Sequence, residues 1–90
     1  MSIDIRITSQ YGRLSRGRHS ARQAHGSGFK WAPRDAHGRL IIREPGVWIL
    51  HCSDGFRRSA RAVLEVAPDG TWEISGDDSR FRVTEGPARS

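Results

Sequence analysis

The sequence predicts a mainly β protein: a small antiparallel meander that curls into a barrel or packs as a two-layer sheet, with an irregular Arg/Gly-rich arm after the first strand. Three observations lead to this fold class. Apolar and polar residues alternate in several runs, turn sequences rich in Pro, Gly, Asp and Ser separate the runs, and β-branched residues favour a strand over a helical turn at 59–66. Ninety residues suffice for one modest core, so residues 1–90 are expected to form a single domain.

The first predicted strand covers residues 3–8. Ile3, Ile5 and Ile7 alternate there with polar side chains, which is the period-two pattern of a strand buried on one face. We therefore expect the three isoleucines to contact the core and the polar residues between them to face solvent.

The alternation ends at residue 9, and residues 9–28 are predicted to form a basic arm or loop. Leu14 is the only aliphatic side chain larger than alanine in this stretch, and four glycines would each weaken a helix interior. A short helix over 15–24 would lack an apolar stripe with which to dock. Because the segment has little apolar surface to bury, it has little reason to fold by itself.

Residues 29–84 are predicted to form the β meander. Residues 39–44 and 47–52 are apolar runs of strand length, and Pro45-Gly46 between them suits the central positions of a type II turn. We therefore expect a β-hairpin at this point. Because its strands are apolar on both faces, they are predicted to lie at the centre of the fold with a covering layer on each side.

A second hairpin is predicted from residues 56–66 and 71–75. The sequence between them, Ala67-Pro68-Asp69-Gly70, is typical of a turn because Pro presets one φ angle and Gly supplies a left-handed residue. Along the first strand of this hairpin, Ala60, Ala62, Leu64 and Val66 share one face.

The last predicted strand covers residues 80–84. Phe81 and Val83 would point inward there, while the arginines that alternate with them would face solvent at a sheet edge. Residues 85–90 are predicted to form a flexible tail.

Charge is distributed unevenly along the chain. Residues 1–43 carry nine basic side chains against two acidic ones, whereas residues 44–90 carry six against eight. The net charge of +5 therefore comes from the first half, and almost all of the basic residues are arginines. A basic segment of this kind is suited to binding a polyanion.

Two clusters of basic side chains are candidate binding residues. The candidates for contact with nucleic acid or a protein partner are Arg13, Arg16, Arg18, Arg22, Lys30, Arg57, Arg58 and Arg61. Arginine binds phosphate oxygens in a fork and stacks on bases, and the intervening glycines would let the backbone follow a groove. Two other interpretations stay open: a solvated loop in an arginine-rich proteome, and basic residues that protect an edge strand from strand addition.

The aromatic residues beside the arm allow two interpretations. Phe29 and Trp31 lie on the same side of an extended chain and next to Lys30, so they would provide a platform for base stacking. Burial in the core is the more common fate of such a pair, and we expect it here. Trp48 and Trp72 lie within strand patterns and are predicted to be core residues.

No motif predicts a metal site, a cofactor or catalysis. The histidines and Cys52 lack the close paired spacing of zinc ligands. No nucleophile elbow, defined pair of carboxylates or phosphate-binding loop is present either, so we expect a protein without enzymatic activity.

A cytoplasmic location is expected by default. Cys52 has no second cysteine with which to form a disulfide, and the chain begins without the apolar region of a signal peptide. The sequence contains no apolar run of membrane-spanning length, so no membrane partner is expected.

Two functions are consistent with these features. The first is a small non-catalytic nucleic-acid-binding protein that contacts the phosphates of RNA or DNA through its basic arm. The second is a protein-binding inhibitor or regulator of the phage or mobile-element type, similar in kind to anti-CRISPR proteins, that docks on an acidic protein surface and blocks a nucleic-acid-handling complex. A subunit that assembles through its sheet edges is a third possibility, and the sequence leaves the oligomeric state open.

Overall fold

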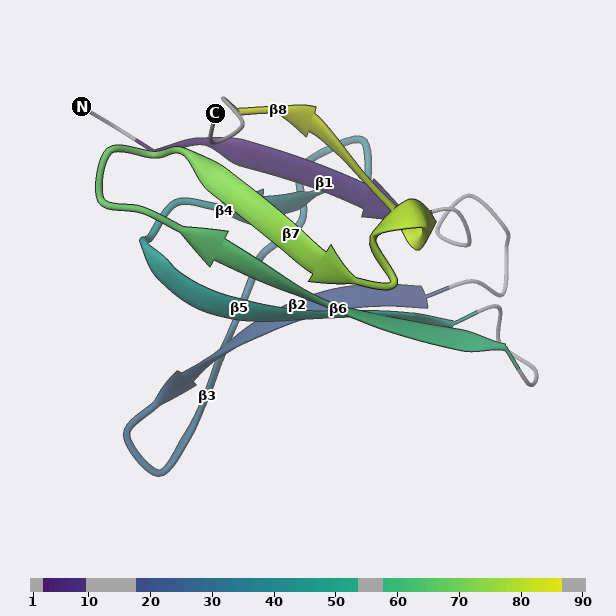
Figure 1. Cartoon of the computed structure of the whole chain (residues 1–90), viewed down its shortest axis with the longest axis horizontal. Helices are drawn as coiled ribbons and strands as arrows, with labels where there is room; N and C mark the ends of the chain where they lie inside the picture. Colours follow the sequence, from purple (N-terminus) through teal and green to yellow (C-terminus); the bar gives the residue numbers. More distant parts are fainter. Residues whose placement is uncertain (1–2, 10–17, 54–57, 87–90) are drawn as a thin grey trace.

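The computed structural model describes residues 3–9, 18–53 and 58–86, which form two antiparallel sheets lying face to face (Figure 1). The strands are β1 (Ile5–Ser9), β2 (Arg18–His25), β3 (Gly28–Trp31), β4 (Leu40–Ile42), β5 (Gly46–Ser53), β6 (Ser59–Val66), β7 (Trp72–Gly76) and β8 (Phe81–Glu85), with a 3₁₀ turn, η1 (Asp78–Arg80), before the last. The three-stranded sheet has the order β4-β1-β8, and the five-stranded sheet has the order β3-β2-β5-β6-β7. The two-layer alternative is thus confirmed, and no strand pairing closes the described strands into a barrel.

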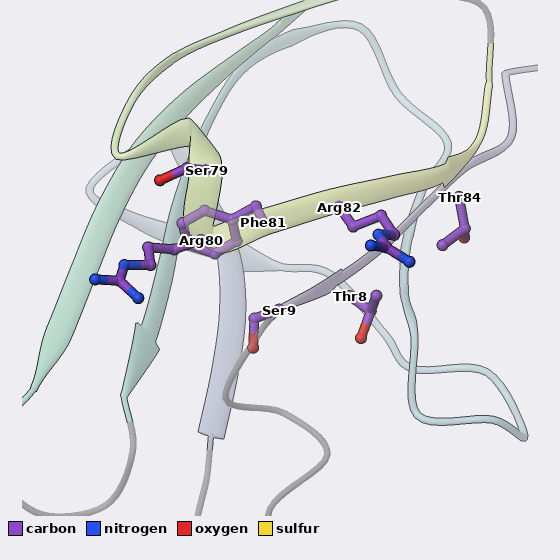
Figure 2. A pocket seen from close by; sticks show the side chains of 7 residues that line it. All are labelled: Thr8, Ser9, Ser79, Arg80, Phe81, Arg82 and Thr84. Atoms are coloured by element: carbon purple, nitrogen blue, oxygen red, sulfur yellow. The ribbon is translucent and has the colours of Figure 1, made fainter.

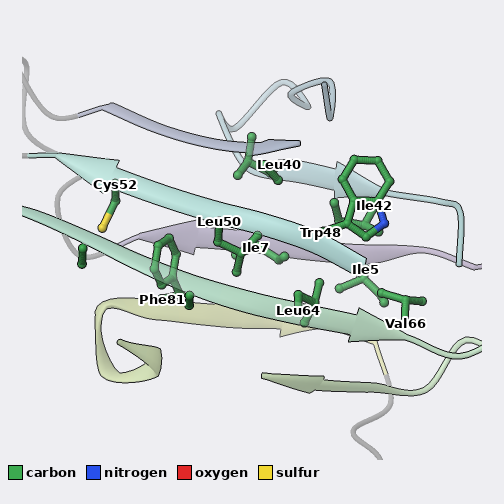
Figure 3. Close-up of a cluster of buried hydrophobic side chains, with 13 residues drawn as sticks. Ile5, Ile7, Leu40, Ile42, Trp48, Leu50, Cys52, Leu64, Val66 and Phe81 are labelled. Atoms are coloured by element: carbon green, nitrogen blue, oxygen red, sulfur yellow. The ribbon is translucent and has the colours of Figure 1, made fainter. Parts of the chain in front are cut away.

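The core lies between the two sheets (Figure 3). Its apolar side chains are Ile5, Ile7, Ala21, Leu40, Ile42, Trp48, Leu50, Cys52, Ala60, Ala62, Leu64, Val66 and Phe81. On β5 and β6 these side chains occupy every second position, because successive residues of a strand point to opposite faces. Trp48 is buried as expected, and its indole Nε1 donates a hydrogen bond to the Glu44 carbonyl at 3.1 Å.

The second predicted hairpin is confirmed. β6 and β7 pair from Ala62 opposite Gly76 to Val66 opposite Trp72. In the turn, the Gly70 amide donates to the Ala67 carbonyl at 2.9 Å. Gly70 has a φ of +91°, a backbone conformation that residues other than glycine rarely adopt.

The predicted hairpin through Pro45-Gly46 is wrong. β4 pairs with β1 in the three-stranded sheet, whereas β5 pairs with β2 and β6 in the five-stranded sheet. The turn therefore carries the chain from one layer to the other. The expected cover on both faces is also missing, because Val47 on β5 is 53 % exposed. Apolar runs identify strands, but they do not specify which strand becomes the partner.

The expected irregular arm over residues 9–28 is not confirmed. Residues 18–25 form β2, which pairs with both β3 and β5, and residues 10–17 lie outside the described part of the chain. The helix considered over 15–24 is excluded for the residues that β2 contains. The inward side chains of β2 include His19 and Ala21, which are 5 % and 1 % exposed. The strand carries no large apolar side chain at these inward positions, so its sequence lacks the alternation that predicts a half-buried strand.

The last strand is confirmed, with a shift at its ends. Phe81 is buried and Val83 is half-buried, while the strand extends to Glu85, one residue into the predicted tail. β8 pairs with β1, so the first and last strands of the chain are neighbours. The three-stranded sheet is therefore not a simple meander, because its strand order does not follow the sequence.

Candidate functional site

The five-stranded sheet has one face packed on the three-stranded sheet and one face turned away from it, which we call the outer face (Figure 1). The alternation of burial and the strand registers assign side chains to the outer face: Ser20, Arg22 and Ala24 from β2, Phe29 and Trp31 from β3, Val47, Ile49, His51 and Ser53 from β5, Ser59, Arg61, Val63 and Glu65 from β6, and Glu73 and Ser75 from β7. Large apolar side chains on this face have no covering layer among the described residues.

Two aromatic rings are exposed at the β3 edge of the outer face. Phe29 and Trp31 are 54 % and 56 % exposed, and their ring centroids lie 6.5 Å apart with the planes tilted by 58°. The expectation that both belong to the core is wrong. The reason is that the register of β3 with β2 puts both side chains on the outer face, which is turned away from the three-stranded sheet.

Arg22 on β2 lies against both rings. Its guanidinium carbon is 5.0 Å from the centroid of Phe29 and 6.0 Å from that of Trp31. Such contacts stabilise a cation over an aromatic face by about 0.5–1 kcal/mol at exposed sites. The Nε of Arg22 is buried and has no hydrogen-bond partner among the described residues. The three side chains thus form a cationic, aromatic surface, which we call the stacking platform.

Basic groups lie on the outer face beside the stacking platform. His51 on β5 is directly opposite Arg61 on β6, and Arg61 is exposed. The Arg61 side chain makes no hydrogen bond or ion pair with any described residue. Arg58 is exposed directly before β6, at the same end of the sheet. This end of the face is therefore suited to contact with anions.

The opposite corner of the outer face is acidic. Glu65 on β6 and Glu73 on β7 are directly opposite each other, and both are exposed. Charge on the face therefore changes from basic and aromatic near β2 and β3 to acidic near β7. The two carboxylates make this corner the acidic part of the described outer face.

The structure brings together only some of the predicted binding residues. Arg22 and Arg61 lie on the outer face, and Arg58 lies close to its end. Arg18 is the first residue of β2, opposite Ser53. Lys30 is paired with Glu44 instead, and its register with Gln23 places it on the inward side of the hairpin. Three candidates, Arg13, Arg16 and Arg57, lie outside the described residues.

His51 is a residue of this site that no pattern in the sequence indicates, whereas Phe29 and Trp31 are at the surface and not in the core where they were expected. The available signal was the alternation of Phe29 and Trp31 along one side of an extended chain. It shows that the two rings share a face, but it does not show whether a second layer covers that face.

Two other arginines are engaged inside the fold. Arg6 donates to Asp35 at 3.0 Å and to Asp4 at 2.8 Å, and Arg39 donates to Asp35 at 2.8 Å and to Glu85 at 3.1 Å. Burial by itself raises the pKa of Asp35. Hydrogen bonds from the backbone amides of Arg39 and His37 and from the Arg39 guanidinium lower that pKa by a larger amount, so the pKa lies well below its usual value. These ion pairs fix the three-stranded sheet to the chain before β4.

A pocket of about 390 Å³ lies on the three-stranded sheet, away from the stacking platform (Figure 2). Its lining residues are Thr8, Ser9, Ser79, Arg80, Phe81, Arg82 and Thr84. The lining is polar and basic, but no described group in it is both buried and without a partner. The pocket contributes no residue to the outer face.

The described residues contain neither a metal-binding cluster nor a membrane-spanning helix. No group of three or more His, Cys, Asp or Glu side chains lies together in a way that could hold a metal ion, and none of the helical segments is long and apolar enough to cross a bilayer. The expectations of no metal and no catalysis stay predictions. Comparison of the chain with protein-family models, with curated proteins and with solved structures gives no match.

Proposed function

We propose that this protein binds nucleic acid through the outer face of its five-stranded sheet, without catalysis. The observation that carries the proposal is the contact of the Arg22 guanidinium with Phe29 and Trp31, two rings that are more than half exposed. Base stacking on exposed aromatic rings contributes about 1–3 kcal/mol per base, and arginine adds a cation that attracts phosphate. The stacking platform combines both kinds of group.

The charge of the chain supports the same function. The net charge is +5, and Arg61 and His51 continue the basic surface from the stacking platform across the sheet. The contacts expected are stacking and phosphate contacts, which discriminate little between base sequences. Compared with the sequence-based hypothesis, the main contact moves from an arm to a sheet face, and Arg13, Arg16 and Arg57 stay candidates for further phosphate contacts.

A protein-binding inhibitor or regulator is the second candidate. The observation in its favour is Val47, which is 53 % exposed on the same face as Phe29 and Trp31. Exposed apolar side chains near an arginine resemble the anchors of protein interfaces. A pull-down with and without nuclease separates the two candidates, because a partner that survives nuclease treatment supports the second.

The test of the first candidate is a salt titration of binding to a labelled single-stranded oligonucleotide. Log K should fall linearly with log salt, with a slope of about −0.7 per phosphate contacted. Arg61→Ala should make the slope shallower by one such contact. Arg82→Ala is the matched control, because it removes an exposed arginine from β8 in the other sheet and should leave the slope unchanged.

Two results would overturn the proposal. One is the absence of binding to any nucleic acid at low salt. The other is an equal loss of affinity for Arg61→Ala and Arg82→Ala, since this would assign the attraction to net charge alone and not to the outer face.

A further inference from the structure

We infer that the outer face accepts a single strand of about four nucleotides, which runs from Phe29 and Trp31 at the β3 edge across the sheet to His51 and Arg61. This inference rests on the proposed function and adds to it the class of nucleic acid, the length of the site and the direction of the strand.

The strand registers supply the length. Trp31, Arg22, Ile49 and Val63 form one row across β3, β2, β5 and β6, because Arg22 is opposite both Trp31 and Ile49, and Ile49 is opposite Val63. Neighbouring strands lie about 4.8 Å apart, so three steps between strands span about 14 Å. Single-strand-binding β folds contact from about four nucleotides upward, and a row of this length corresponds to the short end of that range.

The exposed rings specify a single strand. A ring stacks only on a base whose own face is free, and in a duplex the base faces are covered by neighbouring base pairs. The planes of Phe29 and Trp31 are tilted by 58°, so each ring is placed to accept its own base. Ile49 and Val63 are half-buried beside Arg22 in the same row and form an apolar floor for the bases that follow.

The charges on the outer face specify the direction. Two residues along the strands from the Ile49–Val63 pair, His51 lies opposite Arg61, and the imidazole and guanidinium N–H groups of this pair can bind phosphate. In the row on the other side, Glu65 lies opposite Glu73, and both are exposed. A phosphate backbone that leaves the stacking platform therefore turns toward Arg61 and away from Glu73, since the acidic pair repels it.

The experiment measures dissociation constants for a ladder of single-stranded oligonucleotides and for a blunt duplex of matched length. Affinity should rise up to about four nucleotides and then level off, and the single strand should bind about tenfold or more tightly than the duplex. The change Trp31→Ala should weaken single-strand binding by about tenfold or more and leave the salt slope unchanged. Trp31→Phe keeps a ring and should restore most of the affinity.

Tryptophan emission provides a second measurement. Trp31 is 56 % exposed and Trp48 is 2 % exposed, so a stacked base should quench the emission of Trp31. The quenching should disappear in Trp31→Phe and persist in Trp72→Phe, because Trp72 donates a hydrogen bond to the Gly86 carbonyl at the far edge of the sheet.

The outcomes separate this inference from the proposed function. Equal affinity for duplex and single strand, or full affinity in Trp31→Ala, overturns the inference while the binding itself leaves the proposed function in place. No binding to either form overturns both. The inference is also overturned by a purified protein partner whose binding is lost in Trp31→Ala and is not competed by added single-stranded oligonucleotide.

Discussion

The guanidinium carbon of Arg22 lies 5.0 Å from the centroid of the Phe29 ring, on a face of the five-stranded sheet that no described strand covers. The β2–β3 hairpin produces this contact, because its register puts Arg22 opposite Trp31 and Ala24 opposite Phe29. The contact therefore depends on strand pairing, and it arranges a planar cation for stacking before any ligand is present.

Arg22→Lys tests whether the plane of the guanidinium matters as well as its charge. Lysine keeps the positive charge but cannot stack as a plane, so we expect nucleic-acid affinity to fall several-fold with no change in the salt slope. Arg22→Ala should lower the affinity and also make the dependence of log K on log salt shallower, because a charge is lost. The measurement is a salt titration of the two variants beside the unchanged protein, and full affinity in Arg22→Lys would contradict the role of the plane.

Trp48 and Trp31 should differ sharply in their effect on stability. Trp48 is 2 % exposed, and Trp48→Ala should lower the free energy of unfolding by about 3–5 kcal/mol, as a large-to-small change in a core does. Trp31→Ala removes a ring that is 56 % exposed and should change that free energy by less than about 1 kcal/mol. Urea unfolding of both variants measures this difference. A well-folded Trp48→Ala protein of unchanged stability would show that the assignment of Trp48 to the core is wrong.

The stability of the fold should decrease as the pH falls below about 6.5, because of His19. Burial lowers the pKa of His19 below its usual value of 6.5, and the nearby charge of Arg34 lowers it further. Nε2 of His19 donates to the Gly38 carbonyl at 3.0 Å, while Nδ1 is buried without a partner among the described residues. The unfolded chain therefore binds a proton at a higher pH than the folded protein does, which favours unfolding on acidification.

Urea unfolding between about pH 5 and pH 7 measures this dependence on pH. In His19→Gln the slope of stability against pH should flatten over that range, whatever the stability of the variant. Asp35 does not contribute to this dependence. Because its pKa is lowered in the folded protein, Asp35 stabilises the fold above pH 3.8, its usual pKa, and that stabilisation is lost only at lower pH. An unchanged slope in His19→Gln would assign the effect to another group.

Local features of the sequence were sufficient to predict the β class, most of the inward-facing residues and one hairpin. The alternation at Ile5 and Ile7 and along β6 predicts burial correctly, since side chains on a strand change face at every residue. The turn at Gly70 was predictable because proline and glycine restrict the backbone within four residues. The arginine content likewise predicted an attraction to anions, which stays a prediction.

Long-range pairing decided the remaining features. The partner of β4 proved to be β1 and not β5, and the stretch containing His19 and Ala21 became an inner strand because β5 was available beside it. Phe29 and Trp31 are exposed because strand pairing places them on the outer face, which points away from the three-stranded sheet. Alternation places a side chain on one of two faces of a strand, but only the packing of distant segments determines which face is covered. For this protein, the sequence by itself determined the β class and the two-sidedness of most strands, with β2 as the exception, because alternation is a local property. The tertiary structure decided which aromatic and basic groups reach solvent together, because that depends on the pairing of distant segments.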